Sequence, residues 1–228
     1  MSASRFLRYL GAAVATLALV SAPLPSASAQ PSASPQPPCP DVELIFARGT
    51  FEPPGVGGVG QAFVDALRSK VGARSLEVYA VNYPASTDFP TAIDGVRDAT
   101  NHIEATATNC PKTKMVLGGF SQGAAVIGFV TSAVVPDGVD ASGVPAPMRP
   151  EIAEHVAAIA LLGKPSNRFM SMINSPPVVI GPLYTSKTLD LCISNDPICA
   201  DSGDGAAHNL YPVNGMVDQA AEYAATRL

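Results

Sequence analysis

The stretch Lys114-Met115-Val116-Leu117-Gly118-Gly119-Phe120-Ser121-Gln122-Gly123 decides the fold. A short apolar run, typical of a strand, leads into G-x-S-x-G, and the Ala-rich segment Ala124–Val135 behind it predicts a helix. This arrangement is the nucleophile elbow, a tight turn that lifts a Ser hydroxyl above the sheet edge. Glycines suit it because the strand and helix backbones leave no room for a Cβ. The pattern predicts Ser121 as a nucleophile, against the alternative of an ordinary Ser in a glycine-rich turn.

The segments around this turn alternate between strand and helix patterns. Further strands are expected at Val42–Ala47, Leu76–Val81, His155–Leu162 and Lys187–Cys192, and helices at Val59–Val71, Asp88–Thr108 and after a cap at Asn214. Such alternation predicts an α/β fold, a three-layer α/β/α sandwich with a parallel sheet covered on both faces. Working groups gather at the carboxyl ends of parallel strands, which is where the turn places Ser121.

The first 29 residues have the anatomy of a secretory signal peptide rather than of an uncleaved anchor. Arg5 and Arg8 precede an apolar run that is too short to span a bilayer, and Ala27-Ser28-Ala29 offers a cleavage site. Residues 30–38 are Pro- and Ser-rich and predict a flexible leader. We therefore expect a signal peptide at 1–29, a leader at 30–38 and one domain at 39–228.

Composition and charge limit the partners of the exported chain. Loss of the signal peptide leaves 12 basic and 19 acidic residues, a formal charge of −7, which disfavours nucleic acid and anionic membranes as partners. No later stretch is long and apolar enough for a membrane helix. We expect a secreted, extracellular monomer without stable membrane insertion, with attachment to the cell envelope left open.

The chain has four cysteines, Cys39, Cys110, Cys192 and Cys199, and an even number in an exported protein predicts two disulfides. Sequence alone permits three pairings. Cys192 and Cys199 are the natural local bridge, which leaves Cys39 with Cys110. The spacing typical of metal ligands is absent from the sequence, and we expect neither a metal nor another cofactor.

A Ser nucleophile needs a base, and the base needs an acid that fixes its tautomer. The chain has three histidines: His102 in a predicted helix, His155 at the start of a predicted strand, and His208 in a polar, Gly-rich loop. The elbow fold places Ser, acid and His in that chain order, and only His208 can come last. His208 is therefore the predicted base, against the alternative of a plain surface histidine.

The acid must lie between Ser121 and His208. The nearby aspartates are Asp190, Asp196, Asp201 and Asp204. Asp196 alone lies inside the small ring that a Cys192–Cys199 bridge would close, where it could be held rigidly for His208. The alternative is that Asp196 merely begins a turn before Pro197. For the oxyanion, the predicted donors are the backbone N–H of Gln122 and the loop Arg48–Glu52, where Thr50 could add its hydroxyl.

These motifs together resemble the cutinase family, in particular secreted cutinase-like serine esterases of actinobacteria. The matching pieces keep the family's order along nearly the whole mature chain: Phe46–Glu52, Tyr83–Ala85, Gly119–Gly123, Cys192–Cys199 and His208–Tyr211. The resemblance implies a small α/β-hydrolase with five central parallel strands, and carboxylic ester hydrolase activity. It also implies a Ser121–Asp196–His208 triad, an oxyanion hole from Thr50 and Gln122, and the pairings Cys39–Cys110 and Cys192–Cys199.

Two further features bear on the substrate. Family members commonly have Gly-Asp-Pro where this chain has Gly163-Lys164-Pro165, so Lys164 changes the charge near the active-site end of the sheet. No insertion has the length of a lipase lid, and no lid domain is expected. The apolar loop Pro165–Leu183 could wall an acyl groove or could simply pack onto the core.

The sequence thus predicts a secreted serine esterase that cleaves short- to medium-chain acyl esters or lipids through an acyl-enzyme. Two alternatives use the same triad: a phospholipase, and an acyltransferase with an alcohol acceptor. A third is a catalytically silent secreted binding protein, whose expected sign would be a missing triad residue.

Overall fold

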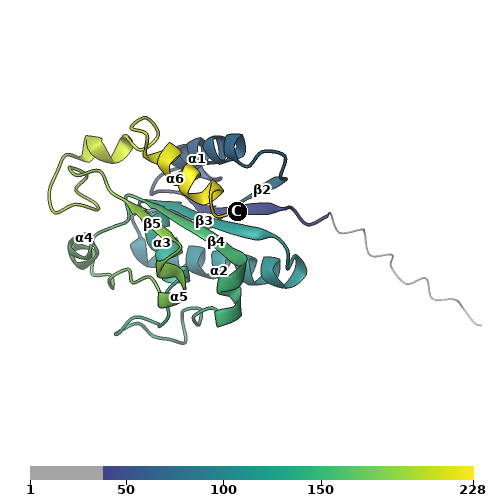
Figure 1. Cartoon of the computed structure of the whole chain (residues 1–228). Coiled ribbons are helices and arrows are strands. Elements are labelled where there is room, and N and C mark those ends of the chain that lie inside the picture. Colours follow the sequence, from purple (N-terminus) through teal and green to yellow (C-terminus); the bar gives the residue numbers. More distant parts are fainter. Residues whose placement is uncertain (1–37) are drawn as a thin grey trace, which may run out of the picture. The chain divides into compact units, whose positions relative to one another are not determined.

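Five parallel strands form the centre of the structure, a computed structural model that describes residues 38–228 (Figure 1). They are β1 Val42–Ala47, β2 Leu76–Ala80, β3 Lys114–Phe120, β4 Val156–Leu162 and β5 Thr188–Leu191, in the order β2-β1-β3-β4-β5. This confirms the predicted five-stranded parallel sheet. The signal peptide predicted at 1–29, and all of the predicted leader except Pro38, lie outside the described residues.

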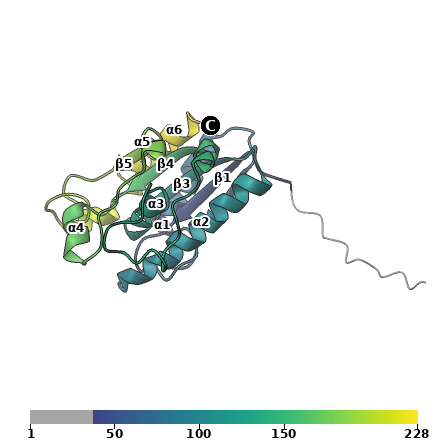
Figure 2. The ribbon, with the colours of Figure 1, turned by 90° about the horizontal axis from the view of Figure 1, so that it is seen from below.

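Helices cover both faces of the sheet. They are α1 Gly57–Lys70, α2 Ala92–Asn109, α3 Gln122–Val130, α4 Asn167–Met172, α5 Pro182–Thr185 and α6 Met216–Ala225. Helices α1 and α6 share one apolar core with the sheet, and α2 and α3 share the core on the other face (Figure 2). Because both faces are covered, β1 is buried along its whole length, which explains why all of its six residues except Glu43 are apolar. Within residues 38–228, no helix is long and apolar enough to cross a bilayer.

Helix α3 differs from its predicted bounds. It begins at Gln122, directly behind the elbow Ser, and ends at Val130 rather than at Val135. Thr131 ends it: its hydroxyl bonds back to the Ile127 carbonyl at 2.9 Å, and its own carbonyl accepts the Gly181 N–H at 2.8 Å. The carbonyl is thus used by a distant segment, which local sequence could not reveal.

Smaller differences occur at other element ends. The helix predicted from Asp88 starts with a 3-10 turn, η1 Phe89–Thr91, and the Asp88 side chain makes no capping hydrogen bond. A second 3-10 turn, η2 Pro150–His155, contains His155, so β4 begins one residue later than predicted. The Asn214 side chain accepts the Met216 N–H at 3.0 Å, as expected of a cap, although Gly215 with φ +87° directly precedes α6.

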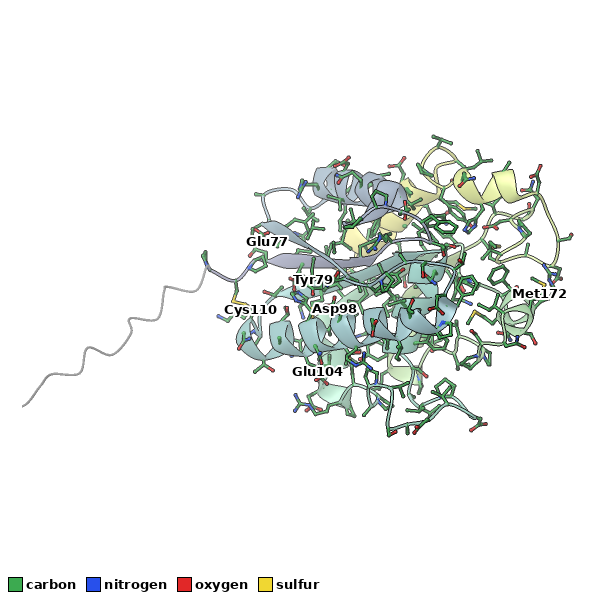
Figure 3. The ribbon with its side chains drawn as sticks, turned by 180° about the vertical axis from the view of Figure 1, so that it is seen from behind. Glu77, Tyr79, Asp98, Glu104, Cys110 and Met172 are labelled. Atoms are coloured by element: carbon green, nitrogen blue, oxygen red, sulfur yellow. A yellow bond between two sulfur atoms is a disulfide. The ribbon has the colours of Figure 1, made fainter. Side chains whose placement is uncertain are left out.

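Both predicted disulfides, Cys39–Cys110 and Cys192–Cys199, are formed. The first joins the chain just before β1 to the residue that follows α2. The second closes a small loop after β5. They lie at opposite ends of the strands, and Figure 3 shows Cys110 at one end of the sheet and Met172, from helix α4, at the other. The carboxyl end, beside α4, carries the candidate site.

Candidate active site

Ser121 occupies a strained turn between β3 and α3. Its backbone has φ +55° and ψ −119°, a conformation that costs free energy and that often marks functional sites. A Cβ on Gly119 would lie 2.4 Å from the carbonyl oxygen of Gly123, and one on Gly123 would lie 2.0 Å from that of Ala47. Neither position can hold a larger residue without moving the backbone. The predicted elbow is confirmed, and so is the reason for its glycines.

Asp196 lies inside the Cys192–Cys199 ring and is fully buried. Its Oδ2 lies 2.7 Å from Nδ1 of His208, and its Oδ1 accepts the Ile198 N–H at 2.9 Å. A buried carboxyl group needs such hydrogen-bond partners, because burial removes it from water. The structure therefore brings together the predicted acid and the predicted base.

The other three aspartates have different surroundings. Asp190 lies 3.3 Å from Lys164 Nζ, and partial burial raises the pKa of its carboxyl while the ammonium opposes the rise. Asp204 accepts the Ala206 N–H at 2.9 Å and so caps a 3-10 turn, η3 Gly205–Asn209. Asp201 is exposed. None of the three contacts His208 through a hydrogen bond.

His208 is held from three sides in turn η3. Its ring stacks on Phe120, with centroids 4.8 Å apart, and Asp196 binds Nδ1. Behind it, a Cβ on Gly163, which has φ +60°, would lie 3.1 Å from Cε1 of the imidazole. The ring is thus fixed with Nδ1 toward the acid, which leaves Nε2 as the nitrogen available to a Ser hydroxyl.

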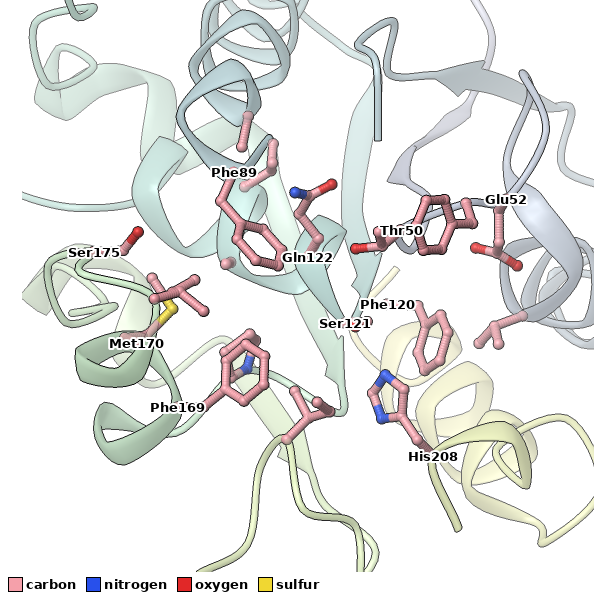
Figure 4. A pocket seen from close by; sticks show the side chains of 18 of the residues that line it. Thr50, Glu52, Phe89, Phe120, Ser121, Gln122, Phe169, Met170, Ser175 and His208 are labelled. Carbon is pink, nitrogen blue, oxygen red and sulfur yellow. The ribbon is translucent and has the colours of Figure 1, made fainter. Parts of the chain in front are cut away.

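Ser121 and His208 line the same cavity of about 490 Å³, together with Thr50 and Gln122 (Figure 4). Within residues 38–228, no hydrogen bond of 3.5 Å or less joins Ser121 to His208. Catalytic hydrogen bonds are often long without substrate and shorten when it binds. The walls beyond Ser121 are largely apolar, and the rings of Phe89 and Phe169, which both line the cavity, pack edge to face with centroids 6.5 Å apart.

The loop that carries Thr50 is held by groups that the sequence did not single out. Arg48 is buried and donates to the carbonyls of Tyr83 and Glu52 at 2.6 and 2.9 Å. Glu52 accepts the N–H groups of Gly49 and Gly58, both at 2.6 Å. Arg48 and Glu52 were visible only as part of the matched motif, and their contacts explain why charged residues occur there.

Tyr211 is a second residue whose contacts sequence reasoning missed. It is fully buried, and its hydroxyl donates to Oδ2 of Asp196 at 2.9 Å, the same oxygen that faces His208. The hydroxyl also accepts the Ile193 N–H at 3.2 Å. Burial, followed by hydrogen bonding to Asp196 and its charge, raises the pKa of Tyr211, so the phenol stays a donor. The only sequence signal was its position, three residues after His208.

The apolar loop after β4 has a mixed role. Phe169, Met170 and Ile173 line the cavity, whereas Val178 packs beneath α3 against Ala125. Lys164 does not line the cavity, because its ammonium pairs with Asp190. Among residues 38–228, no group of three His, Cys, Asp or Glu side chains could hold a metal ion.

Comparison with known proteins agrees with this geometry. The family model described as Cutinase matches residues 38–228. The chain belongs to the cutinase family. Ser121, on its elbow, and His208, paired with Asp196, line one cavity at the carboxyl end of the sheet.

Three similar relatives carry carboxylesterase or phospholipase names. Probable carboxylesterase Culp5 of Mycobacterium tuberculosis is 58% identical over 172 residues, 75% of this chain and 98% of the relative. Carboxylesterase Culp1 of the same organism is 48% identical over 233 residues, 100% of this chain and 98% of the relative. Phospholipase Culp4, also of that organism, is 47% identical over 216 residues, 95% and 88% of the two chains.

Among solved structures, a Trichoderma reesei cutinase in complex with a C11Y4 phosphonate inhibitor has a TM-score of 0.63 and 31% identity. The match covers 83% of this chain and 77% of the cutinase. The expected α/β-hydrolase fold of the cutinase type is thereby confirmed.

Proposed function

We propose that this chain is a secreted serine esterase in which Ser121 is the nucleophile, His208 the general base and Asp196 the acid that orients His208. As a member of the cutinase family with carboxylesterase-named relatives, the chain is a carboxylic ester hydrolase. One observation carries the assignment of residues: the buried Asp196 lies 2.7 Å from Nδ1 of His208, and His208 lines the same cavity as the elbow Ser.

The proposed reaction has two halves. Ser121 Oγ attacks the ester carbonyl carbon while Nε2 of His208 takes the hydroxyl proton. The Gln122 N–H and Thr50 stabilise the resulting oxyanion, and the N-terminal end of α3 favours negative charge there. The intermediate collapses, the leaving alcohol takes the proton from His208, and an acyl-enzyme remains. Water, deprotonated by His208, then releases the carboxylic acid and restores Ser121.

The cavity supports acyl esters of short to medium length as substrates. It holds about 490 Å³, and apolar side chains such as Phe89, Val126 and Phe169 form most of its wall. Turnover of p-nitrophenyl butyrate by the purified mature protein, and its loss in Ser121→Ala with an unchanged unfolding temperature, would support the assignment. Substantial residual turnover in Ser121→Ala would exclude it, and no turnover in the wild type would favour a silent binding protein.

Phospholipase activity is a second candidate, because one relative bears that name. Release of fatty acid from phosphatidylcholine at a rate comparable to butyrate ester hydrolysis would favour it. Acyl transfer is separated by adding an alcohol acceptor: a new ester at the expense of free acid identifies a transferase.

Export is part of the same proposal. Two disulfides fit an oxidising, extracellular setting. Mass spectrometry of the protein from culture medium should find Gln30 as the first residue, and a full-length chain retained in the cytosol would contradict secretion. Light scattering should report a monomer.

A further inference from the structure

A second cavity, here called the distal cavity, lies beside the catalytic one. It holds about 430 Å³ between the start of α2, the end of α3 and the loop of residues 132–147. Four residues line both cavities: Phe89, Ala92, Phe129 and Ser175. The two cavities therefore meet at one shared wall, and Figure 4 shows Phe89 among the side chains that line the catalytic cavity.

The walls of the distal cavity suit an uncharged, apolar ligand. Valines and prolines supply most of the loop side, including Val134, Val139 and Val144. Asp140 is the only charged residue of the lining. The Ser132 hydroxyl is already used, because it donates to the Val134 carbonyl at 2.9 Å. A polar ligand would find few partners here, whereas an alkyl chain would need none.

Hydrogen bonds hold both sides of the distal cavity in place. On the loop side, Arg97 of α2 donates to the Gly143 carbonyl at 3.0 Å. On the shared side, the Gln122 side-chain amide donates to the Ser86 carbonyl at 2.9 Å, just before the turn that carries Phe89. Ala92 has the smallest side chain of the four residues that line both cavities, so it leaves the most room for a ligand at the shared wall.

We propose that the distal cavity receives the far end of a long acyl chain whose ester carbonyl lies at Ser121. The inference rests on the proposed function and extends its substrate class from short and medium chains to long ones. A linear alkyl chain fits because both cavities have largely apolar walls and share Phe89, Ala92 and Phe129, so a chain that passes Ala92 would keep apolar contacts from one cavity to the other. Each methylene buried in this way contributes up to about four-fold in kcat/KM.

The test compares p-nitrophenyl palmitate with p-nitrophenyl butyrate on two variants. Val144→Trp fills the distal cavity, and Ala141→Trp places the same side chain at an exposed position of the same loop that lines neither cavity. Val144→Trp should lower kcat/KM for the palmitate ester by about ten-fold or more, which corresponds to the loss of burial of roughly two methylenes. Butyrate hydrolysis should stay within about two-fold, and Ala141→Trp should change neither.

A labelling experiment covers the case in which Val144→Trp does not fold. All four cysteines form disulfides, so Val144→Cys introduces the single free thiol. A hexadecyl phosphonate on Ser121 should slow maleimide labelling of this thiol by about ten-fold, because most of the alkyl group would be buried and its far end would cover the thiol. A butyl phosphonate is too short to reach the distal cavity and should not slow the labelling.

Equal effects of Val144→Trp on both esters, or equal labelling with both phosphonates, would overturn the distal site while leaving the esterase intact. Failure of either phosphonate to react with Ser121, together with no hydrolysis of the butyrate ester, would instead overturn the proposed function itself.

Discussion

Both ends of the sheet have a histidine paired with a carboxylate, a disulfide nearby and an aromatic ring stacked on the imidazole. At the amino end, near the Cys39–Cys110 bridge, His102 Nε2 lies 2.7 Å from Oε1 of Glu43. At the carboxyl end, near the Cys192–Cys199 bridge, His208 Nδ1 lies 2.7 Å from Oδ2 of Asp196. Each imidazole stacks on an aromatic ring, His102 on Tyr79 and His208 on Phe120. A His–carboxylate pair with a disulfide nearby is therefore not, by itself, an active site.

The difference lies in what surrounds each ring. His102 lies flat on Tyr79, at 3.4 Å between centroids, and Glu43 also accepts the Thr106 hydroxyl, so the pair ties α2 to β1. His102 lines neither cavity. His208 instead uses Nδ1 for its acid and turns its other edge into a cavity that contains Ser121. The comparison teaches that function depends on the group that the free nitrogen can reach.

Replacing each of the two histidines should give the largest difference in kcat between the two ends of the sheet. His208→Ala should lower kcat for p-nitrophenyl butyrate by about 10⁴-fold or more, because triad members act as a unit. His102→Gln, which keeps a hydrogen-bond donor for Glu43, should change kcat by less than about two-fold. Steady-state kinetics on both variants checks this, and similar losses in both would remove the distinction.

Replacing the two carboxylates should also have different effects: Asp196 should matter for activity and Glu43 for stability. Asp196→Asn should lower kcat by about 10³- to 10⁴-fold, since the amide cannot hold His208 in the correct tautomer. Glu43→Gln should leave kcat nearly unchanged but cost about 1–3 kcal/mol in the free energy of unfolding, because a buried charged hydrogen bond is lost. Urea titrations and kinetics measure both, and loss of activity in Glu43→Gln with intact folding would contradict the scheme.

Loss of the Cys39–Cys110 disulfide should cost more stability, whereas loss of the Cys192–Cys199 disulfide should cost more activity. Replacing Cys39 and Cys110 with Ser should cost about 4 kcal/mol of stability, because that bridge closes a loop with a sequence separation of 71, and about 2.5 kcal/mol is expected for the separation of 7 between Cys192 and Cys199. Activity should follow the reverse order. Loss of the small ring, which contains Asp196, should lower kcat by up to about 10²-fold through misplacement of the acid. Full activity of the Cys192→Ser, Cys199→Ser variant at a temperature where it is folded would show that the ring does not position Asp196.

The smallest effect is predicted for the loss of a tyrosine hydroxyl that donates to a carboxylate, and a second tyrosine of this kind provides the control. Tyr211→Phe should lower kcat about ten-fold, because Oδ2 of Asp196 loses one of its donors. The carboxylate then stabilises protonated His208 more strongly, so the acid side of the pH–rate profile should move to higher pH. Tyr79→Phe, which removes the hydrogen bonds to Asp98, is the matched control. If the pH–rate profile of Tyr211→Phe does not shift, the Tyr211 hydroxyl does not act on the Asp196–His208 pair, and Tyr211 only packs in the core.

Sequence reasoning succeeded where local chemistry determines the structure. The nearly continuous apolar run His155–Leu162 predicted a strand covered on both faces, and Gly119 and Gly123 were required by the close backbone contacts of the elbow. Chain order selected His208 from three histidines, and the predicted ring around Asp196 is formed. These features follow from residues close in sequence or from a fixed order.

The features that were missed depend on contacts between distant segments. Helix α3 ends early because the Gly181 N–H bonds to the Thr131 carbonyl, and the Tyr211 hydroxyl reaches Asp196 from 15 residues further along the chain. Short helices α4 and α5 lie where only a loop was expected, since neither has the length that produces a clear period. The distal cavity likewise arises from three segments whose sequences give no local signal.

Reaction with a p-nitrophenyl alkylphosphonate tests the central claim most directly. Ser121 Oγ should displace p-nitrophenolate from phosphorus and retain one phosphonyl group, located by peptide mass spectrometry. The account predicts a single label on Ser121, formed at nearly the wild-type rate in His102→Gln and at least about 10³-fold more slowly in His208→Ala. A label on another residue, or equal labelling rates in the two histidine variants, would contradict it.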